Sequence, residues 1–230
     1  MSENNIVILN GARTAMGSFQ GSLAPMSAPQ LGGACIREAV ARAGLQAADV
    51  EDVVMGCVLP AGLKQGPARQ AMRLAGLPDS TGATTINKLC GSGMRATMFC
   101  HDMIKAGSHD IVVSGGMESM SNAPYILDKA RGGYRMGHGQ VADHMFLDGL
   151  EDAETGRLMG AFAQDVADQR GISREQMDNF AIESLKRAQA AIDNGWFADE
   201  IVPVTVKTRK GDTVVDTDEQ PGNANIDKIP

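Results

Sequence analysis

The sequence predicts an α/β fold in which a mostly parallel sheet is covered by helices on both faces. Short apolar runs alternate along the chain with segments whose apolar residues recur at helical spacing, and this alternation is typical of parallel sheets. The 230 residues are 43% hydrophobic but only 4% aromatic, so the core must be built from aliphatic side chains, alanine and methionine. With 21% charged residues, the composition excludes a disordered, collagen-like or membrane chain.

The first part of the chain supplies most of the predicted sheet. A buried strand is expected at Ile6-Val7-Ile8-Leu9, and further strands at residues 50–58, 83–89 and 111–116, where apolar and β-branched residues are dense. Helices are expected at residues 29–43, 67–75 and 94–106. The three helical segments are followed by Gly44, Gly76 and Gly107, and glycine is the residue that most often ends a helix.

Residues 121–157 break this pattern, because they carry several glycines and mixed charge without a sustained period. We interpret them as an excursion that adds no strand to a sheet. Two helices follow, at residues 158–169 and 173–192, and the second begins with a capping box formed by Ser173 and Gln176. Residues 201–206 and 213–215 predict a hairpin around Lys210-Gly211-Asp212. Residues 220–230 are expected to form a loop, so that the chain stops in mid-fold.

Charge and cysteine usage exclude several function classes. A net charge of -7 would repel a phosphate backbone, so we expect no nucleic-acid partner. The four cysteines form no C-x-x-C pair and have no zinc-ligand spacing with the four histidines, which predicts no metal site and reduced thiols in a cytoplasmic protein. The N-terminal Met1-Ser-Glu-Asn-Asn5 lacks signal-peptide character, and no run of eighteen apolar residues occurs, so neither secretion nor a membrane span is expected.

One turn of the predicted fold contains a candidate nucleophile. The segment Leu89-Cys90-Gly91-Ser92-Gly93-Met94 places a cysteine between a predicted strand and a predicted helix, in a turn whose glycines permit close backbone approach. The unpaired N–H groups and the positive end of the helix favour thiolate over thiol. Sharp strand-to-helix turns of this kind present nucleophiles in acyl-transfer enzymes. Alternatively, Cys90 is a small buried residue in a glycine-rich turn.

Two longer motifs favour the nucleophile. The segments Asn87-Lys-Leu-Cys90-Gly-Ser-Gly-Met-Arg95 and Ser114-Gly-Gly-Met-Glu-Ser-Met-Ser-Asn-Ala-Pro124 closely resemble the N-terminal half of the thiolases. Asn10-Gly-Ala-Arg-Thr14 with Gly17 resembles the opening strand and loop of that family. The resemblance runs from residue 6 to the end, and it implies a layered α-β-α fold of which this chain is the N-terminal half.

The resemblance implies an acyltransferase, an acetyl-CoA C-acetyltransferase of fatty acid metabolism. Cys90 matches the residue that accepts the acetyl group from acetyl-CoA, and its backbone N–H would be one donor of an oxyanion hole. A second acetyl-CoA is then condensed to acetoacetyl-CoA, or the reverse cleavage occurs. A polarisable thiolate suits this task, because it attacks a thioester and forms one of similar energy. Coenzyme A thioesters are substrates, and no metal or redox cofactor is implied.

The resemblance also assigns roles within residues 121–230, interpreted as a loop domain that follows an α/β domain of residues 1–120. Residues 125–138 resemble the tetramerisation loop of acetoacetyl-CoA thiolases, which implies a homotetramer. Leu150 and Met159 match residues that line the substrate channel, with ordinary packing against a helix as the alternative. Many relatives carry a histidine just before that methionine, whereas this chain has Leu158.

No histidine of this chain matches the catalytic histidine of the family. His101 lies eleven residues after Cys90, or roughly 16 Å along a helix, so it cannot be the thiol's base. His138 and His144 are expected at the surface or between subunits, and His109 in a loop. The resemblance implies that the histidine, a second cysteine and an asparagine come from a C-terminal domain absent from this chain, which alone is expected to be incomplete for turnover.

Two other interpretations remain open. The first is a 3-ketoacyl-CoA thiolase of longer chain length, or a condensing ketosynthase of the same fold. The second is a fragment that binds or carries coenzyme A thioesters without turnover, which the absence of the catalytic histidine and second cysteine favours.

Overall fold

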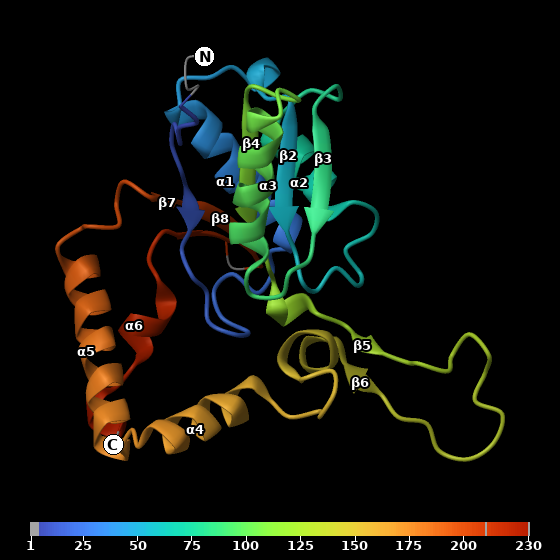
Figure 1. Ribbon diagram of the computed structural model, residues 1–230, viewed down its shortest axis with the longest axis vertical. Coiled ribbons are helices and arrows are strands. Elements are labelled where there is room, and N and C mark those ends of the chain that lie inside the picture. Colours follow the sequence, from blue (N-terminus) through green and yellow to red (C-terminus); the bar gives the residue numbers. More distant parts are fainter. Residues whose placement is uncertain (1–4, 210, 230) are drawn as a thin grey trace.

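A three-stranded parallel sheet forms the centre of the molecule (Figure 1). The computed structural model describes residues 5–209 and 211–229, so the expectations for Met1 to Asn4, Lys210 and Pro230 lie outside it. The strands are β2 (Asp52–Gly56), β3 (Gly82–Ile86) and β4 (Val112–Gly116), and β2 lies between the other two. Gly56 pairs with Ile86 and Gly116, so all three strands end at the same edge.

Helices cover both faces of this sheet. Helices α1 (Ala28–Arg42) and α2 (Pro67–Ala75) pack on one face, and α3 (Ser92–Lys105) lies on the other. The side chains of β2 alternate accordingly: Val53 and Met55 join the core cluster of α1 and α2, whereas Val54 packs with the buried residues of α3. The predicted layered α-β-α fold is confirmed. The predicted bounds of α2 agree at both ends, because Pro67 begins it and Gly76, with φ +89°, ends it.

The strand predicted at Ile6–Leu9 is wrong. These residues adopt no strand pairing, and the side chain of Ile8 is 85% exposed. Pairing begins only at β1 (Arg13–Thr14), which lies parallel to β7 (Ile201–Val202). The apolar run predicted both burial and a partner strand, and the described structure shows neither for Val7, Ile8 and Leu9. Residues 5–14 instead border a cavity of about 860 Å³ whose other walls come from α1, α3 and β4.

The excursion has more structure than its composition indicates. Two-residue strands, β5 (Tyr125–Ile126) and β6 (Ala142–Asp143), pair antiparallel, so the prediction that no strand occurs here is wrong. Between them, residues 127–141 form an arm that extends from the body (Figure 1). A five-residue π-helix, Phe146–Leu150, follows β6.

The C-terminal part contains the two predicted helices and the hairpin. Helix α4 spans Met159–Arg170, and α5 spans Arg174–Asp193. The capping box is confirmed, since the hydroxyl of Ser173 accepts the Gln176 N–H at 3.2 Å. The hairpin consists of β8 (Val204–Thr208) and β9 (Gly211–Val215). None of the described helices has both the length and the apolar character needed to cross a membrane.

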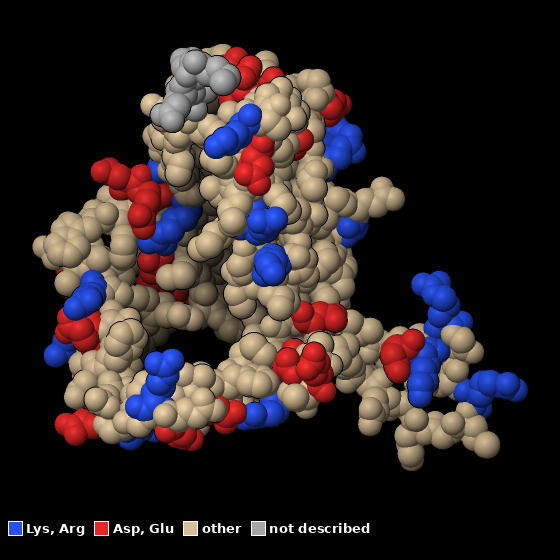
Figure 2. Space-filling model, in the orientation of Figure 1, with Lys and Arg blue, Asp and Glu red and all other residues tan. Residues whose placement is uncertain are grey.

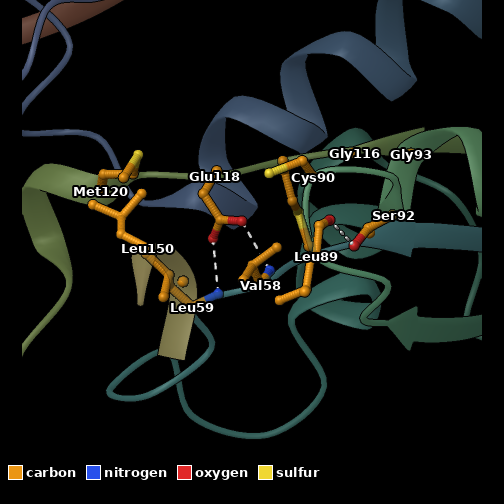
Figure 3. A pocket seen from close by; sticks show the side chains of 13 residues that line it. Val58, Leu59, Leu89, Cys90, Ser92, Gly93, Gly116, Glu118, Met120 and Leu150 are labelled. Carbon is orange, nitrogen blue, oxygen red and sulfur yellow. Dashed lines mark hydrogen bonds between the residues drawn. The ribbon is translucent and has the colours of Figure 1, made fainter. Parts of the chain in front are cut away.

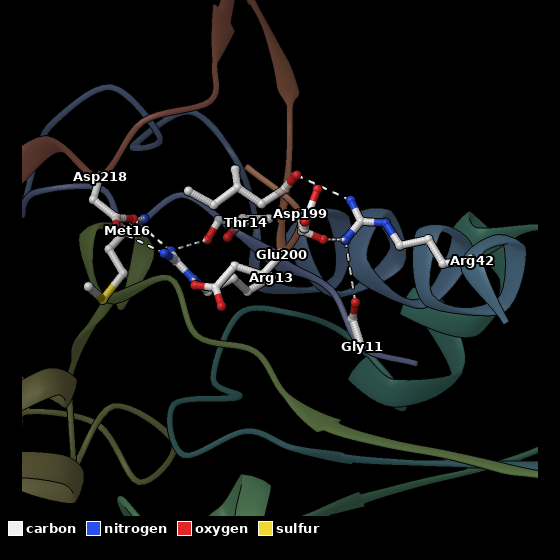
Figure 4. Close-up of polar contacts among 9 residues, drawn as sticks. Gly11, Arg13, Thr14, Met16, Arg42, Asp199, Glu200 and Asp218 are labelled. Atoms are coloured by element: carbon white, nitrogen blue, oxygen red, sulfur yellow. Dashed lines mark hydrogen bonds and ion pairs between the residues drawn. The ribbon is translucent and has the colours of Figure 1, made fainter. Parts of the chain in front are cut away.

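Short 3₁₀ turns occur at Ala47–Asp49, Met120–Asn122 and Ile226–Lys228. The loop expected over residues 220–230 is wrong in its first part, which forms the short helix α6 (Glu219–Asn223). Two tertiary contacts hold the start of this helix. The Asp218 carboxylate accepts a hydrogen bond from Arg13 (Figure 4), and the Glu219 carboxylate accepts the Ser18 N–H; local sequence gives no sign of either.

Arg13 and Asp218 connect the two ends of the described chain (Figure 4). The Arg13 guanidinium donates to both carboxylate oxygens of Asp218, at 2.7 and 3.0 Å, and to Glu200 at 2.6 Å. The Asp218 carboxylate also accepts the Met16 N–H at 2.8 Å. Burial disfavours the charged carboxylate, but these hydrogen bonds and the Arg13 charge outweigh it, and they hold the pKa of Asp218 below its ordinary value.

Asp218→Asn in the complete protein should lower the free energy of unfolding by about 1–3 kcal/mol near neutral pH, because a charged hydrogen-bonding partner of Arg13 is lost. A carboxylate with a depressed folded pKa stabilises the protein above its unfolded pKa of about 3.9, and this contribution disappears as pH falls through the folded value. The difference in free energy of unfolding between variant and wild type should therefore become smaller in acid. Urea unfolding at a series of pH values from 7 to 3 measures this difference.

Asp79→Asn is the matched control, since Asp79 forms an exposed ion pair with Arg73 and exposed pairs contribute little. A difference for Asp218→Asn that stays constant down to the lowest pH would contradict the assignment.

Candidate active site

A cavity of about 430 Å³ lies at the edge where the parallel strands end (Figure 3). Its lining residues come from the ends of β2 and β4, the start of α3 and the π-helix: Gly56, Val58, Leu59, Leu89, Cys90, Ser92, Gly93, Gly116, Met117, Glu118, Met120, Gly149 and Leu150. Two of the three predicted site residues, Cys90 and Leu150, thus meet in one cavity. Met159 is not among its lining residues, and its substrate contact stays a prediction.

Side-chain hydrogen bonds hold the turn that carries Cys90. The Asn87 side chain accepts the Leu89 N–H at 2.8 Å. The Ser92 hydroxyl accepts the Lys88 N–H at 2.8 Å and donates to the Leu89 carbonyl at 2.6 Å. Leu89 has φ +50°, a left-handed conformation that costs free energy for a residue with a Cβ and is often found at functional sites. The sharp turn predicted before α3 is therefore present, with Cys90 exposed at its apex.

Gly56 allows the start of α3 to lie against the strand ends. A Cβ on Gly56 would lie 2.5 Å from the Cβ of Ser92, so the helix or the strand would have to shift. The Cβ position of Gly116 lies 3.5 Å from the Cα of Gly93, an ordinary contact distance. The Ser92 N–H donates to the Leu89 carbonyl at 3.0 Å, so the first N–H group of α3 serves to hold the turn. The positive end of the helix dipole, two residues after Cys90, favours a thiolate and the oxyanion of an attacked carbonyl.

Glu118 anchors the opposite wall, a role that the motif containing it did not reveal. Its carboxylate accepts the N–H groups of Val58 and Leu59 at 2.8 and 3.0 Å (Figure 3), and the Cys57 thiol lies 3.5 Å away. The sequence signal was a single carboxylate two residues after a strand that ends in Gly-Gly, at the sheet edge where parallel α/β folds place their sites.

The other three cysteines are poor nucleophiles. Burial, and then the nearby charge of Glu118, raise the pKa of Cys57 to about 12. Burial, and then Asp52, raise the pKa of Cys100 to about 11. Burial also raises the pKa of Cys35, although the Thr14 backbone and Arg42 oppose it. Cys90 is the exposed cysteine of the chain, so access and helix position distinguish it from the others.

None of the four histidines lines this cavity. His101 is half-exposed on α3 beside Asp102, at 3.1 Å, and His109 lies 3.7 Å from Asp52. His144 is expected from the sequence at the surface or between subunits. The surface position is wrong, because its side chain is buried within this chain and contacts Asp148, and the position between subunits stays a prediction. The described residues therefore place no imidazole at Cys90.

Cys90 should be the fastest thiol to react with limiting iodoacetamide in the folded complete protein, because alkylation requires an accessible thiolate. At pH 8 a thiol of pKa about 12 is only about one part in 10⁴ thiolate, so Cys90 should react at least about 10-fold faster than Cys57. Peptide mapping against time measures the four rates, and urea-unfolded protein, in which the four should react alike, is the control. Faster labelling of Cys35, Cys57 or Cys100 in the folded sample would contradict the assignment.

Comparison with known proteins agrees with this geometry. A family model described as "Thiolase, N-terminal domain" matches residues 6–229. The chain is 48% identical over 218 residues to the acetyl-CoA acetyltransferase of Pseudomonas aeruginosa, a match that covers 94% of this chain and 56% of that protein. The corresponding figures for the acetyl-CoA acetyltransferase of Escherichia coli are 49%, 94% and 55%. For acetyl-CoA acetyltransferase IB of Candida tropicalis they are 46% over 227 residues, 97% and 56%.

The chain thus spans about half the length of the curated relatives it matches. The match over nearly all of this chain, together with a cysteine on a glycine-rich turn before α3, places the protein in the thiolase family.

Proposed function

We propose that the complete protein is an acetyl-CoA C-acetyltransferase that works through an acetyl-Cys90 intermediate. The observation that carries this proposal is the exposed Cys90 at the start of α3, in a cavity at the carboxyl edge of a parallel sheet. The names of the relatives support it. The Cys90 thiolate attacks the carbonyl carbon of acetyl-CoA, the carbon–sulfur bond to coenzyme A breaks, and the departing thiolate takes up a proton.

Condensation requires more than Cys90. The α-carbon of a second acetyl-CoA loses a proton and attacks the acetyl-Cys90 carbonyl, which releases the Cys90 thiolate and gives acetoacetyl-CoA. A base for that α-proton and a second oxyanion site each contribute about 10² to 10⁴ in rate. No histidine of this chain lines the cavity. We therefore propose that these groups belong to a part of the complete protein outside this chain, since the chain covers only 56% of the relative from Pseudomonas aeruginosa.

The cavity suits a small acyl group. Its walls include the apolar side chains of Leu59, Met117, Met120 and Leu150, which exclude water and strengthen polar contacts to a developing oxyanion. Leu150 is proposed to contact the acyl group, while the proposed role of Met159 rests on the family resemblance alone. Coenzyme A thioesters are the proposed substrates, in a cytoplasmic enzyme of fatty acid metabolism that needs no metal or redox cofactor.

Cys90→Ala in the complete protein should abolish the acetyl-enzyme and lower thiolysis of acetoacetyl-CoA by about 10³-fold or more, because the nucleophile is lost. Intact-mass measurement after incubation with acetyl-CoA, followed by peptide mapping, detects the adduct. Cys57→Ala, which removes a buried thiol beside the cavity wall, is the matched control and should still be acetylated at Cys90. An acetyl adduct on the Cys90→Ala protein would refute the mechanism. Faster thiolysis of longer 3-ketoacyl-CoA substrates would instead favour the longer-chain enzyme.

We also infer that the complete protein assembles as a homotetramer through the arm of residues 127–141. Basic side chains gather on the arm (Figure 2). The lysine and arginine residues between positions 127 and 141 are Lys129, Arg131 and Arg135. Met136 is 97% exposed, which is unusual for a large apolar side chain unless another surface covers it. The arm extends away from the body of the chain (Figure 1). We therefore propose that it packs against a partner subunit, which holds it in one conformation.

Deleting residues 129–140 from the complete protein should convert tetramers to dimers and leave the sheet domain folded, because the arm projects away from the core. Sedimentation velocity measures the change, and far-UV circular dichroism checks the fold. Met136→Ser is a milder variant that should weaken the tetramer in the same direction. An unchanged sedimentation coefficient for the deletion variant would refute the role of the arm.

A further inference from the structure

A buried histidine lies at the start of the π-helix that forms one wall of the cavity. The side chain of His144 is 5% exposed, and its Nδ1 lies 2.6 Å from a carboxylate oxygen of Asp148. An ionised carboxylate only accepts hydrogen bonds, so Nδ1 carries the proton of this bond. The other nitrogen, Nε2, is buried without a hydrogen-bond partner among the described residues. Burying a polar nitrogen without a hydrogen bond costs free energy, so the position of this histidine needs a structural explanation.

The π-helix itself is held from both ends. The Glu151 N–H donates to the Phe146 carbonyl at 2.9 Å, the five-residue spacing of a π-turn. On the entry side, the His144 N–H donates to the Pro124 carbonyl at 3.2 Å, and the Met145 N–H donates to the Asp143 side chain at 2.9 Å. The bond between His144 and Asp148 joins this entry to the body of the turn.

This turn determines where Leu150 lies. Gly149 and Leu150 both line the cavity with Cys90, and the Cβ position of Gly149 is 3.4 Å from Leu59 on the opposite wall. A π-turn holds one residue more than an α-turn, so relaxation to an α-helix would rotate the following residues by about 100° around the axis. Such a rotation would remove Leu150 from the wall and change the size of the cavity.

We propose that His144 and Asp148 act as positioning residues that hold the π-turn, and through it Leu150, against the cavity, and thereby set the size of acyl group that is accepted beside Cys90. This inference rests on the proposed function for its catalytic readout. His144 and Asp148 touch neither the substrate nor Cys90 in this role, and they act through the placement of Leu150.

The first test measures two substrates of different acyl-chain length with the complete protein and its variants. His144→Ala should change the ratio of kcat/KM for acetoacetyl-CoA to that for 3-ketohexanoyl-CoA by about 10-fold, since misplacing a wall by the size of a methylene group or more has effects of this order. The change should lie mainly in KM. His144→Asn, whose amide N–H can still donate to Asp148, should restore the wild-type ratio. His101→Ala, which removes a half-exposed histidine outside the cavity, is the matched control and should leave the ratio unchanged.

Asp148→Ala removes the same hydrogen bond from a half-exposed position and should shift the ratio in the same direction, so the inference stays testable if His144→Ala does not fold. The double variant should be no worse than the more severe single variant, because both changes remove one interaction. Equal ratios for Asp148→Ala and wild type, or no recovery with His144→Asn, would overturn the inference.

A second readout does not depend on turnover. The rates at which Cys90 is alkylated by iodoacetamide and by the bulkier N-phenyliodoacetamide report the space beside its sulfur. Asp148→Ala should change the ratio of these two rates, and His144→Asn should not. If the proposed function failed, wild-type protein would form no acetyl-enzyme while this ratio still responded to Asp148→Ala. If the positioning role failed, acetyl-enzyme would form normally and the ratio would not change.

Discussion

The close approach of α3 to the ends of β2 and β4 determines the position of every other part of the site. It depends on the absence of a side chain at Gly56, because a Cβ there would lie 2.5 Å from the Cβ of Ser92 and 2.8 Å from its backbone carbon. With a Cβ at Gly56, the helix would have to move outward, and the turn before it would move as well. The same contact brings the polar start of the helix to the edge where the parallel strands end.

Side-chain hydrogen bonds hold three parts of the cavity wall. Ser92 holds the turn of Cys90, Glu118 holds the loop after β2, and Asp148 contacts the histidine at the start of the π-turn. Each of these side chains forms a hydrogen bond to the backbone or to a buried group, so each restricts the movement of the segment to which it bonds. Glu118 has a second effect, because the charge that anchors the loop also raises the pKa of the Cys57 thiol. Burial raises the pKa of Cys57 most, and the Glu118 charge adds to it, so this thiol stays protonated near neutral pH.

The sequence predicted the features that local chemistry determines. The bounds of α2 follow from Pro67 and Gly76, and the turn of Cys90 follows from its glycines and its family motif. Features that require a distant partner were not predictable. The pattern of Ile6–Leu9 predicted a buried strand, but a strand needs a neighbour with free backbone groups, and Val7, Ile8 and Leu9 are exposed. The anchoring by Glu118 depends on Val58 and Leu59, about 60 residues earlier in the chain, and the positive φ of Leu89 accompanies the hydrogen bonds around it.

Strand β4 links the two cavities of the molecule. Gly116, Met117 and Glu118 line both the site of Cys90 and the larger cavity beside residues 5–14. The larger cavity is bordered by exposed apolar side chains, including Val7, Ile8 and Leu9, whose burial would be favourable by about 25 cal/mol per Å² of area removed from water. Gly116 ends β4, and Met117 and Glu118 follow it, so one short segment forms part of the wall of both cavities. A change in this segment that alters the wall of the larger cavity would therefore also alter the wall beside Cys90.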